Sequence, residues 1–310
     1  MHQQQQGTGR VVEDDRVTVV VASRDRREEL LASLARHRAP VLLLDNDSRD
    51  GTADAVRAAL PDVEVTRLDH NVGAYARTLG VRAARTPYVA FADDDSWWAP
   101  GALGRAAEVL DAHPDVAVVA ARIHVGAQER LDPFCGELAR SPLPRRPGLP
   151  GPAVLGFVAC AAMVRADAFA SVGGFDDLVR FPGEEERVAL DLAADGWQLV
   201  YVDDVLVHHH PSPARHSPDA RVSAVTRSRV LTAVLRLPVR DVLRTVAAAW
   251  GAGPAPRAGL RAALRDVPRA LRARRVVPRH VQELRALLRD DPAPTRPAPA
   301  PTSAPPQETP

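Results

Sequence analysis

The sequence predicts an α/β fold in which a mostly parallel sheet is covered by helices on both faces. Short apolar segments rich in β-branched residues alternate with segments of about ten residues that have leucine and alanine at helical spacing. The first expected strand, 17–22, is apolar throughout, as strands buried on both faces are. A chain of 310 residues with 45% hydrophobic content can also bury a core of the size that such a fold needs.

Strands and helices alternate along the first part of the chain in the order expected for parallel strands joined by helices. Asp50 or Thr52 would cap the second helix, and Pro100 would stand in the first turn of the fourth. The expected strands are 17–22, 41–44, 63–68, 88–92 and 116–121, and the expected helices are 26–38, 52–60, 74–84 and 100–112. This alternation is typical of nucleotide-binding proteins.

The pattern becomes less regular after Ile123. Residues 132–152 are crowded with proline and glycine, which predicts a long irregular loop. Beyond it we expect an apolar segment at 154–164, helices at 166–172 and 184–194, and short strands at 198–202 and 205–207. From Asp219 to Leu288 we expect Arg-rich amphipathic helices broken at prolines 238, 254, 256, 268 and 278.

Composition suggests four parts and a cellular compartment. We expect disordered tails at 1–15 and 291–310, an α/β domain at 16–212 and a helical extension at 213–290. The 40 basic and 39 acidic residues nearly balance, which argues against a dedicated nucleic-acid-binding protein. The two cysteines lack paired spacing, and neither a signal-peptide core nor a membrane-spanning apolar run is evident. We therefore expect a soluble cytosolic protein.

Three consecutive aspartates, Asp93 to Asp95, directly follow the expected strand at 88–92. Adjacent like charges repel one another unless a cation lies between them, and this end of a strand is where open α/β sheets bind ligands. Mg²⁺ or Mn²⁺ held by one or two carboxylates and a substrate phosphate would fit. The alternative is an acidic turn that caps the helix near Pro100. Trp97 and Trp98 either wall a sugar pocket or pack in the core.

Two further polar segments could join the aspartates around a nucleotide. Asp45 directly follows a predicted strand and could accept a hydrogen bond from a base or a sugar hydroxyl, or its turn could serve only to cap the next helix. Arg77 stands in the helix before the aspartates. Its guanidinium could pair with a phosphate or with one of their carboxylates, or it could lie in solvent.

Acidic and imidazole groups come later in the chain. Glu184 to Glu186 begin a predicted helix, where one carboxylate could act as a general base, or all three could simply favour the positive end of the helix dipole. His208 to His210 follow the last predicted strand. A neutral imidazole there could bind a metal ion or stack on the core.

Taken in order, these motifs resemble those of family 2 of the inverting glycosyltransferases, whose GT-A fold is a Rossmann-like sheet that binds nucleotide-diphosphate sugars. The loop Ala22-Ser23-Arg24-Asp25 stands in place of the family's Pro-Thr-x-Asn type segment. Residues 47–52 match its Asp-x-Ser-x-Asp-Gly-Thr turn, 71–77 its Asn-x-Gly-x-x-x-Arg segment and 93–95 its Asp-x-Asp metal motif. The similarity covers roughly residues 17–210.

The resemblance implies a role for each matched residue. Asp45 would contact the nucleobase, Asp93 or Asp94 the ribose or metal, and Asp95 the metal, with His208 completing the metal shell. Glu185 stands where the family commonly has an aspartate as the catalytic base, and Asp191 where it often has arginine. The other donor-site candidates are Ala22, Ser23, Asp25 and Arg77, and the candidates for an acceptor or sugar pocket are Trp98, Glu184 and Trp197.

We therefore predict a metal-dependent inverting glycosyltransferase that moves a sugar from a nucleotide-diphosphate donor to a hydroxyl of a saccharide, lipid-linked or small-molecule acceptor. Cell-envelope polysaccharide, glycolipid or natural-product glycosylation would be its setting. A sugar nucleotidyltransferase is the first alternative, although 22–27 lacks the glycine of its phosphate loop. A catalytically silent protein of the same fold is the second, although it would not need both Asp95 and Glu185.

The Arg-rich helices of the extension leave two alternatives open. Basic amphipathic helices favour anionic lipid surfaces, so these could rest peripherally on the inner face of the membrane, where a lipid-linked acceptor would lie. Alternatively, they pack on the catalytic domain and expose their arginines to solvent.

Overall fold

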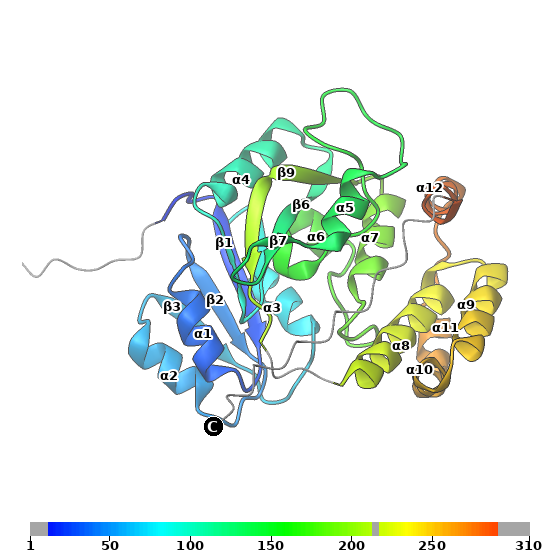
Figure 1. The fold of residues 1–310 in the computed structure, drawn as a ribbon, viewed down its shortest axis with the longest axis horizontal. Helices are drawn as coiled ribbons and strands as arrows, with labels where there is room; N and C mark the ends of the chain where they lie inside the picture. The colour runs from blue at the N-terminus through cyan, green and yellow to red at the C-terminus, as the bar shows by residue number, and fades with distance from the viewer. Residues whose placement is uncertain (1–11, 213–216, 291–310) are drawn as a thin grey trace, which may run out of the picture.

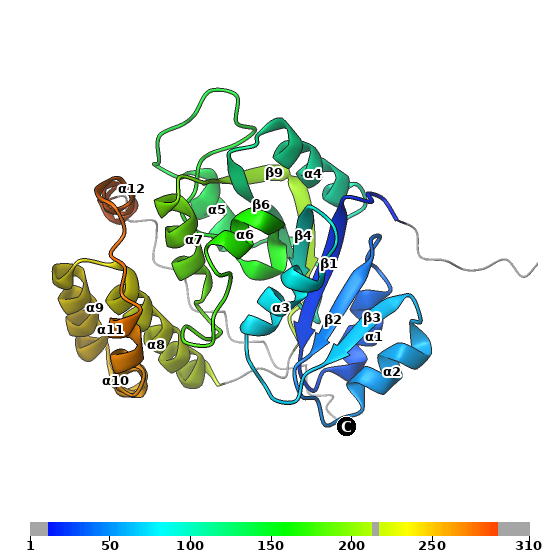
Figure 2. The ribbon, with the colours of Figure 1, turned by 180° about the vertical axis from the view of Figure 1, so that it is seen from behind.

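The computed structural model describes residues 12–212 and 217–290. Within these ranges the chain forms a nine-stranded sheet with helices on both faces, and further helices gather at one side of it (Figures 1 and 2). The strand order is β3-β2-β1-β4-β8-β6-β9-β5, with β7 paired to β6. Six of the nine strands run in one direction, so the expected α/β fold with a mostly parallel sheet is confirmed.

The first half of the sheet closely follows the predicted alternation. Its four strands are parallel neighbours, and β1 lies between β2 and β4. Almost every residue of β1 and β4 is buried, as expected for strands covered on both faces. The elements are β1 (Val17–Ser23), α1 (Arg27–Leu34), β2 (Val41–Asp45), α2 (Thr52–Ala59), β3 (Val63–Arg67), α3 (Tyr75–Ala83) and β4 (Tyr88–Ala92).

The second half of the sheet is mixed, because β8 runs antiparallel between β4 and β6, and β5 runs antiparallel to β9. Its strands and helices are β5 (Ser96–Trp98), α4 (Ala102–Ala112), β6 (Val116–Val125), β7 (Arg130–Leu131), α5 (Pro133–Ala139), the short 3₁₀ helix η1 (Ala159–Ala161), β8 (Ala162–Arg165), α6 (Ala166–Ser171), α7 (Glu185–Ala194) and β9 (Gln198–His209).

Several expected boundaries are wrong. α1 ends at Leu34 rather than Arg38, because the amides of the next residues turn back to carbonyls three positions earlier. The predicted loop at 132–152 contains α5, which Asp132 caps by accepting from the Phe134 amide at 2.9 Å. The two short strands expected at 198–207 form one strand, β9, whose pairing with β6 shifts register at a bulge. The short strands β5 and β7 were not expected.

The C-terminal extension consists of five helices within the described residues. Pro238, Pro254 and Pro278 stand at helix boundaries, as predicted, whereas Pro256 and Pro268 lie in first turns, where a missing amide hydrogen costs no helical bond. The helices are α8 (Pro218–Arg236), α9 (Val239–Gly251), α10 (Pro254–Leu264), α11 (Val267–Arg272) and α12 (Arg279–Asp290).

The extension packs on the α/β domain rather than standing apart from it. Val179, on the loop before α7, belongs to the same hydrophobic cluster as Leu231 of α8. Leu190 of α7 belongs to a second cluster with Val281 of α12. Each cluster therefore buries side chains from both parts of the chain.

The two predicted tails fall largely outside the described residues. The residues outside the described ranges are 1–11, 213–216 and 291–310. The N-terminal tail was nevertheless placed too far along the chain, because the Glu13 amide bonds to the Arg38 carbonyl at 2.8 Å and its carboxylate accepts from the Gly101 amide at 3.0 Å.

Candidate functional site

The carboxyl ends of β2, β1 and β4 lie side by side and carry polar side chains. Ser23 is paired with Asp45 in the β1–β2 register, and its hydroxyl donates to Asp94 Oδ2 at 2.7 Å. Because β1 is the middle strand, this serine joins the nucleobase candidate to the aspartates. Three strands thus contribute to one polar edge, the position at which open α/β sheets bind ligands.

Asp45 is buried at this edge and has an acceptor to spare. Its Oδ1 accepts from the Ser48 amide at 2.9 Å, whereas its Oδ2 is buried without a hydrogen-bond partner among the described residues. A buried carboxylate oxygen of this kind suits an N–H donor from a ligand. The next residue, Asn46, was not predicted; its side chain bonds the Gly73 carbonyl at 3.0 Å and the Val72 amide at 2.8 Å.

Asp25 braces two loops beside the strand ends. Its amide donates to Ser48 Oγ at 2.9 Å, and its Oδ1 accepts from the Arg49 amide at 2.7 Å. The backbone of Asp25 is left-handed, with φ of 52°, a conformation that Asp tolerates better than most residues. Ala22, the other candidate in this segment, is half-buried at the end of β1.

Arg77 is buried and links Asp93 to Glu184, the residue before α7. One guanidinium nitrogen pairs with Asp93 Oδ1, and the other lies 3.4 Å from Glu184 Oε1. The alternative of a solvated helix arginine is therefore wrong. Glu184 is fully buried, and its Oε2 lacks a partner among the described residues. Burial and the neighbouring Glu185 charge raise the pKa of Glu184 to about 8, although Arg77 acts in the opposite direction.

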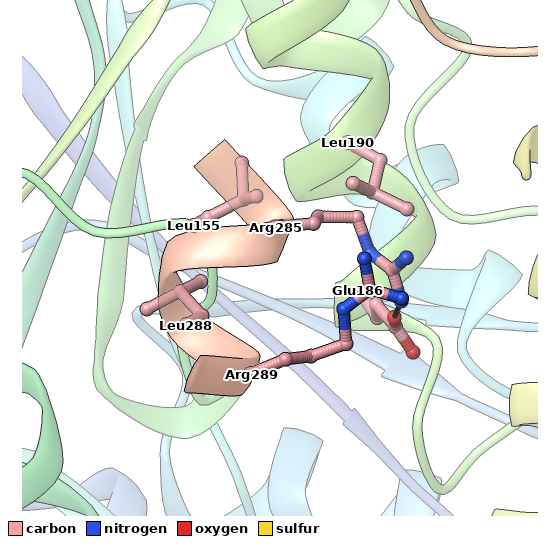
Figure 3. Close-up of a pocket in the computed structure, with 6 residues that line it drawn as sticks. All are labelled: Leu155, Glu186, Leu190, Arg285, Leu288 and Arg289. Carbon is pink, nitrogen blue, oxygen red and sulfur yellow. Dashed lines mark hydrogen bonds and ion pairs between the residues drawn. The ribbon is translucent and has the colours of Figure 1, made fainter. Parts of the chain in front are cut away.

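The three consecutive glutamates contact three different partners. Glu184 faces Arg77, whereas Glu185 Oε1 accepts from the Ala159 amide at 3.3 Å. Burial raises the pKa of Glu185 above its ordinary value. Glu186 Oε1 accepts from Arg285 of α12 at 3.2 Å, at a pocket of about 160 Å³ between α7 and α12 (Figure 3). This pocket is lined by Leu155, Glu186, Leu190, Arg285, Leu288 and Arg289, none of which is a predicted donor-site residue.

Asp95 lies against the end of β9. Its Oδ2 accepts from the Ser212 amide at 3.1 Å, and His209 Nε2 lies 3.3 Å from its Oδ1. His208 does not reach the aspartates: its ring stacks on Trp97 with centroids 5.3 Å apart, and its Nδ1 lies 3.1 Å from Glu129 Oε1. Successive strand residues face opposite sides, so the structure places His209 where the prediction placed His208.

The groups around Asp95 fit a divalent ion that is shared with a substrate. Burial first, and then the charges of Asp93 and Asp95, raise the pKa of Asp94 to about 6. Carboxylate and imidazole are both ligands for Mn²⁺, and Asp95 and His209 would supply one of each. Throughout 12–212 and 217–290, no three Asp, Glu, His or Cys side chains are grouped so as to enclose an ion by themselves. Substrate phosphates would have to complete the shell.

The three residues predicted to form an acceptor or sugar pocket do not line a common pocket in the described structure. Trp98 is buried in the core, where its indole N–H donates to the Phe91 carbonyl at 3.0 Å, so the pocket role is wrong. Trp197 follows the far end of α7, about 15 Å along the helix from Glu185, and packs against the core. Glu184 belongs to the buried Arg77 network.

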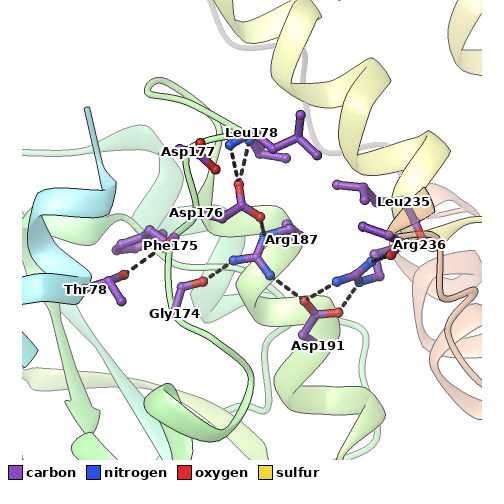
Figure 4. A network of polar contacts seen from close by, with 12 residues as sticks. Thr78, Gly174, Phe175, Asp176, Asp177, Leu178, Arg187, Asp191, Leu235 and Arg236 are labelled. Carbon is purple, nitrogen blue, oxygen red and sulfur yellow. Dashed lines mark hydrogen bonds and ion pairs between the residues drawn. The ribbon is translucent and has the colours of Figure 1, made fainter. Parts of the chain in front are cut away.

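Asp191, the position where the resemblance anticipated an arginine, has a structural role. Its carboxylate accepts from Arg187 Nη1 at 2.6 Å and from Arg236 Nη2 at 3.0 Å (Figure 4). Arg187 also bonds the Gly174 carbonyl and lies 3.0 Å from Asp176. The network therefore ties α7 to both the loop before it and α8.

Two relatives found by sequence comparison are both named as glycosyltransferases. A pre-mycofactocin glycosyltransferase of Mycobacterium tuberculosis is 31% identical over 205 residues, which are 62% of this chain and 42% of that protein. An N-acetylglucosaminyl-diphospho-decaprenol L-rhamnosyltransferase of the same organism is 29% identical over 244 residues, covering 64% of this chain and 78% of the relative. This chain thus spans less than half the length of the first relative.

Solved structures show the same fold at lower identity. A Pyrobaculum calidifontis mannosyltransferase in complex with GDP-Man and Mn²⁺ has a TM-score of 0.52 at 21% identity, over 93% of this chain and 80% of that one. Staphylococcus aureus TarS 1–349 in complex with UDP-GlcNAc has a TM-score of 0.57 at 17% identity, over 86% and 83%. The expected GT-A fold is confirmed. The model of the family described as "Glycosyl transferase family 2" matches residues 14–173, just over half of the 310 residues, and the chain belongs to this family.

Proposed function

We propose that the protein transfers a sugar from a nucleotide-diphosphate donor to an acceptor hydroxyl with inversion at the anomeric carbon. The observation that carries the proposal is the convergence of Asp45, the aspartates 93–95 and the Arg77–Glu184 pair at one edge of the sheet. Glu185 adjoins that pair at the start of α7. In this proposal, donor-binding acids and a base from distant parts of the sequence share one site.

Each group at this edge has a chemical task in the proposal. The spare Oδ2 of Asp45 would accept an N–H of the nucleobase. Glu185 would take the proton of the acceptor hydroxyl as its oxygen bonds to the anomeric carbon. The bond from that carbon to the donor's diphosphate oxygen breaks, and its electron pair leaves with the diphosphate. The acceptor oxygen displaces the diphosphate in one step, with Glu185 as the only base and no covalent sugar intermediate. A single displacement inverts the configuration at the anomeric carbon.

The raised pKa of Glu185 suits this task. A carboxylate with an ordinary pKa is a weak base near neutral pH, and burial makes this one stronger. Arg77 and Glu184 would hold the first turn of α7 in place rather than touch the acceptor.

A divalent ion, Mn²⁺ or Mg²⁺, belongs to the proposal as a cofactor. Asp95 and His209 would hold it, with Asp93 or Asp94 beside them. When bound, such an ion offsets the negative charge that develops on a leaving diphosphate. Burial is the first cause of the raised pKa of Asp94 and the charges of Asp93 and Asp95 add to it, and a cation here would offset those two charges.

The relatives suggest classes of substrate. The two solved structures contain GDP-Man and UDP-GlcNAc, and the M. tuberculosis rhamnosyltransferase is named for a diphospho-decaprenol acceptor. We therefore propose a nucleotide-sugar donor and a lipid-linked, saccharide or small-molecule acceptor.

Within the described residues no helix is long and apolar enough to cross a membrane. We propose a cytoplasmic location with peripheral contact to the inner membrane face.

Two other functions find less support at this site. A sugar nucleotidyltransferase would use a glycine-rich phosphate loop after the first strand, whereas residues 22–27 contain no glycine. A silent binding protein would have no use for the half-buried Glu185 carboxylate, with its raised pKa, beside a second acidic cluster.

A donor screen tests the proposal. UDP, GDP and dTDP sugars are incubated with the full chain, with Mn²⁺ or with EDTA, and the release of nucleoside diphosphate is measured. We expect one nucleotide class to be hydrolysed slowly without acceptor, and only with the metal. Release of pyrophosphate from a nucleoside triphosphate and a sugar phosphate would favour the nucleotidyltransferase instead. Failure of every donor to bind or react would contradict the transferase proposal.

A further inference from the structure

The extension exposes apolar side chains and positive charge together. Between Pro218 and Arg289 there are sixteen arginines and four acidic residues, so this segment has twelve excess positive charges in a chain whose formal net charge is +1. Of the twelve large hydrophobic side chains exposed in the described structure, nine belong to this segment: Val222, Val239, Leu243, Trp250, Leu264, Leu271, Val276, Leu287 and Leu288.

Three of these side chains form a stripe along α9. Val239, Leu243 and Trp250 are 66%, 64% and 58% exposed. At about 100° per residue they fall within an arc of about 40° on the helix surface. The buried residues of α9, Asp241 and Ala249, lie at least about 100° from the centre of this arc. The exposed apolar side chains of α9 therefore lie on a different side of the helix from its buried residues. We call Val239, Leu243 and Trp250 the α9 stripe.

Arginines border the α9 stripe. Arg240 and Arg244 follow it around the helix, and their side chains are 68% and 69% exposed although each lies near Asp241, at 3.7 and 3.2 Å. The Arg257 guanidinium lies 5.4 Å from the centre of the Trp250 ring, and its Nε donates to the Trp250 carbonyl at 2.6 Å. An apolar strip that contains tryptophan and is bordered by arginines is the arrangement of helices that lie in a membrane interface.

We propose that α9 docks on an anionic lipid surface, with the α9 stripe inserted among the headgroups and Arg240 and Arg244 against lipid phosphates. α9 lies at the edge of the molecule remote from β1, β2 and β3 in both views, so a planar surface can reach it (Figures 1 and 2). A second copy of the chain is a poorer occupant, because two such positively charged faces repel each other.

Docking through α9 rests on the proposed function, because the lipid-linked acceptor of that function gives membrane contact a purpose. Docking through α9 would keep the protein at the membrane surface that carries lipid-linked acceptors. It is a statement about a surface and not about the transfer reaction, so the two can fail separately.

Vesicle co-sedimentation of the full chain tests the docking. The probes are phosphatidylcholine vesicles with and without phosphatidylglycerol, at low and at high salt. We expect binding that requires the anionic lipid and that weakens at high salt. The double variant L243A/W250A should bind at least about tenfold more weakly, because its loss of apolar insertion is independent of charge. Leu131→Ala, which removes an exposed leucine from β7, is the matched control and should bind like the wild type.

A second readout guards against a folding defect. On adding anionic vesicles, the tryptophan emission of the wild type should shift to the blue, and the shift should disappear in Trp250→Phe. Unchanged vesicle binding by L243A/W250A would overturn the proposal. So would a wild-type dimer, seen by analytical ultracentrifugation, that the same double variant dissociates. Vesicle binding without any release of nucleoside diphosphate would leave the docking intact and count against the proposed function alone.

Discussion

Glu184, Glu185 and Glu186 are adjacent in the chain, yet each contacts a different partner. Arg77 pairs with the first, the Ala159 amide with the second and Arg285 with the third. The helical rotation of about 100° per residue sends consecutive side chains in different directions, and the partners come from distant segments. In the proposed function, Glu185 is the one of the three that would meet the acceptor hydroxyl.

Replacement of Glu185 by glutamine tests its role as the base. The amide keeps the size of the side chain but cannot take a proton, so we expect the transfer rate to fall about 10²- to 10⁴-fold while donor binding is retained. Single-turnover transfer and equilibrium binding of the donor measure the two effects. Glu186→Gln is the matched control and should keep nearly the wild-type rate. Equal losses in both variants would contradict the assignment.

Glu184 should make stability depend on pH. Its folded-state pKa of about 8 lies above the ordinary value of 4.5, so the folded protein keeps a proton that the unfolded chain has already released. The free energy of unfolding should therefore fall as the pH rises from about 4.5 to 8. Glu184→Gln cannot ionise, so it should gain stability relative to the wild type over this range. Urea unfolding at pH 5 and pH 8 measures the difference, and an opposite trend would refute the raised pKa.

The contact of α3 with the sheet depends on a glycine. A Cβ at Gly80 would lie 2.4 Å from Val20 Cγ1 and 2.9 Å from Leu44 Cδ2, so α3 packs against β1 and β2 at very short range. α3 also carries Arg77, and a displaced helix would move the guanidinium away from the aspartates.

Alanine at two helical glycines should therefore have opposite effects. We expect Gly80→Ala to destabilise the protein by about 1–3 kcal/mol, since the methyl group overpacks a closed interface. Gly104→Ala in α4 is the control, because its nearest non-local neighbour would be 3.8 Å away. It should gain about 0.5–1 kcal/mol from the better helix propensity of alanine. Chemical denaturation of both variants decides, and similar effects would argue against close packing at Gly80.

The joint between α7 and α8 is an ion-pair network on Asp191. Arg187 and Arg236 share this carboxylate, and Arg187 is almost fully buried. Asp191→Asn should destabilise the protein by about 3 kcal/mol, because it removes one of the two carboxylates that face the buried Arg187 guanidinium and leaves only Asp176. Arg236→Gln should cost less, since Asp191 would keep Arg187. Denaturation of the single and double variants in a mutant cycle measures the coupling, and additive losses would show that the two residues do not interact.

The molecule as a whole should unfold as one unit. The α/β domain has a large cluster of its own, but the two clusters that contain Val179 and Leu190 are completed by side chains of α8 and α12, so the two parts share buried apolar surface. We expect calorimetry and circular dichroism to report a single coincident transition. Removal of residues 213–310 should lower the melting temperature. Two separate transitions would show that the extension is an independent domain.

Much of the fold could be predicted because the alternation of apolar runs and helical segments is local. β1 to β4 lie within one residue of their expected bounds. The strands that were missed, β5 and β7, have three and two residues, too short for any periodicity. The omission of β5 had a consequence at the site, because its pairing with β9 determines which histidine faces Asp95.

The sequence by itself determined the order of the first four strands and the helices between them, the acids at the ends of three strands and the family to which the chain belongs. These properties depend on neighbouring residues and on short motifs. The tertiary structure decided that His209 rather than His208 meets Asp95, that Trp98 packs in the core, and that Arg77 joins Asp93 to Glu184. These outcomes depend on which face of a strand a side chain occupies, on how a helix is rotated about its axis and on which distant residues lie opposite. All three are set only when distant segments pack together.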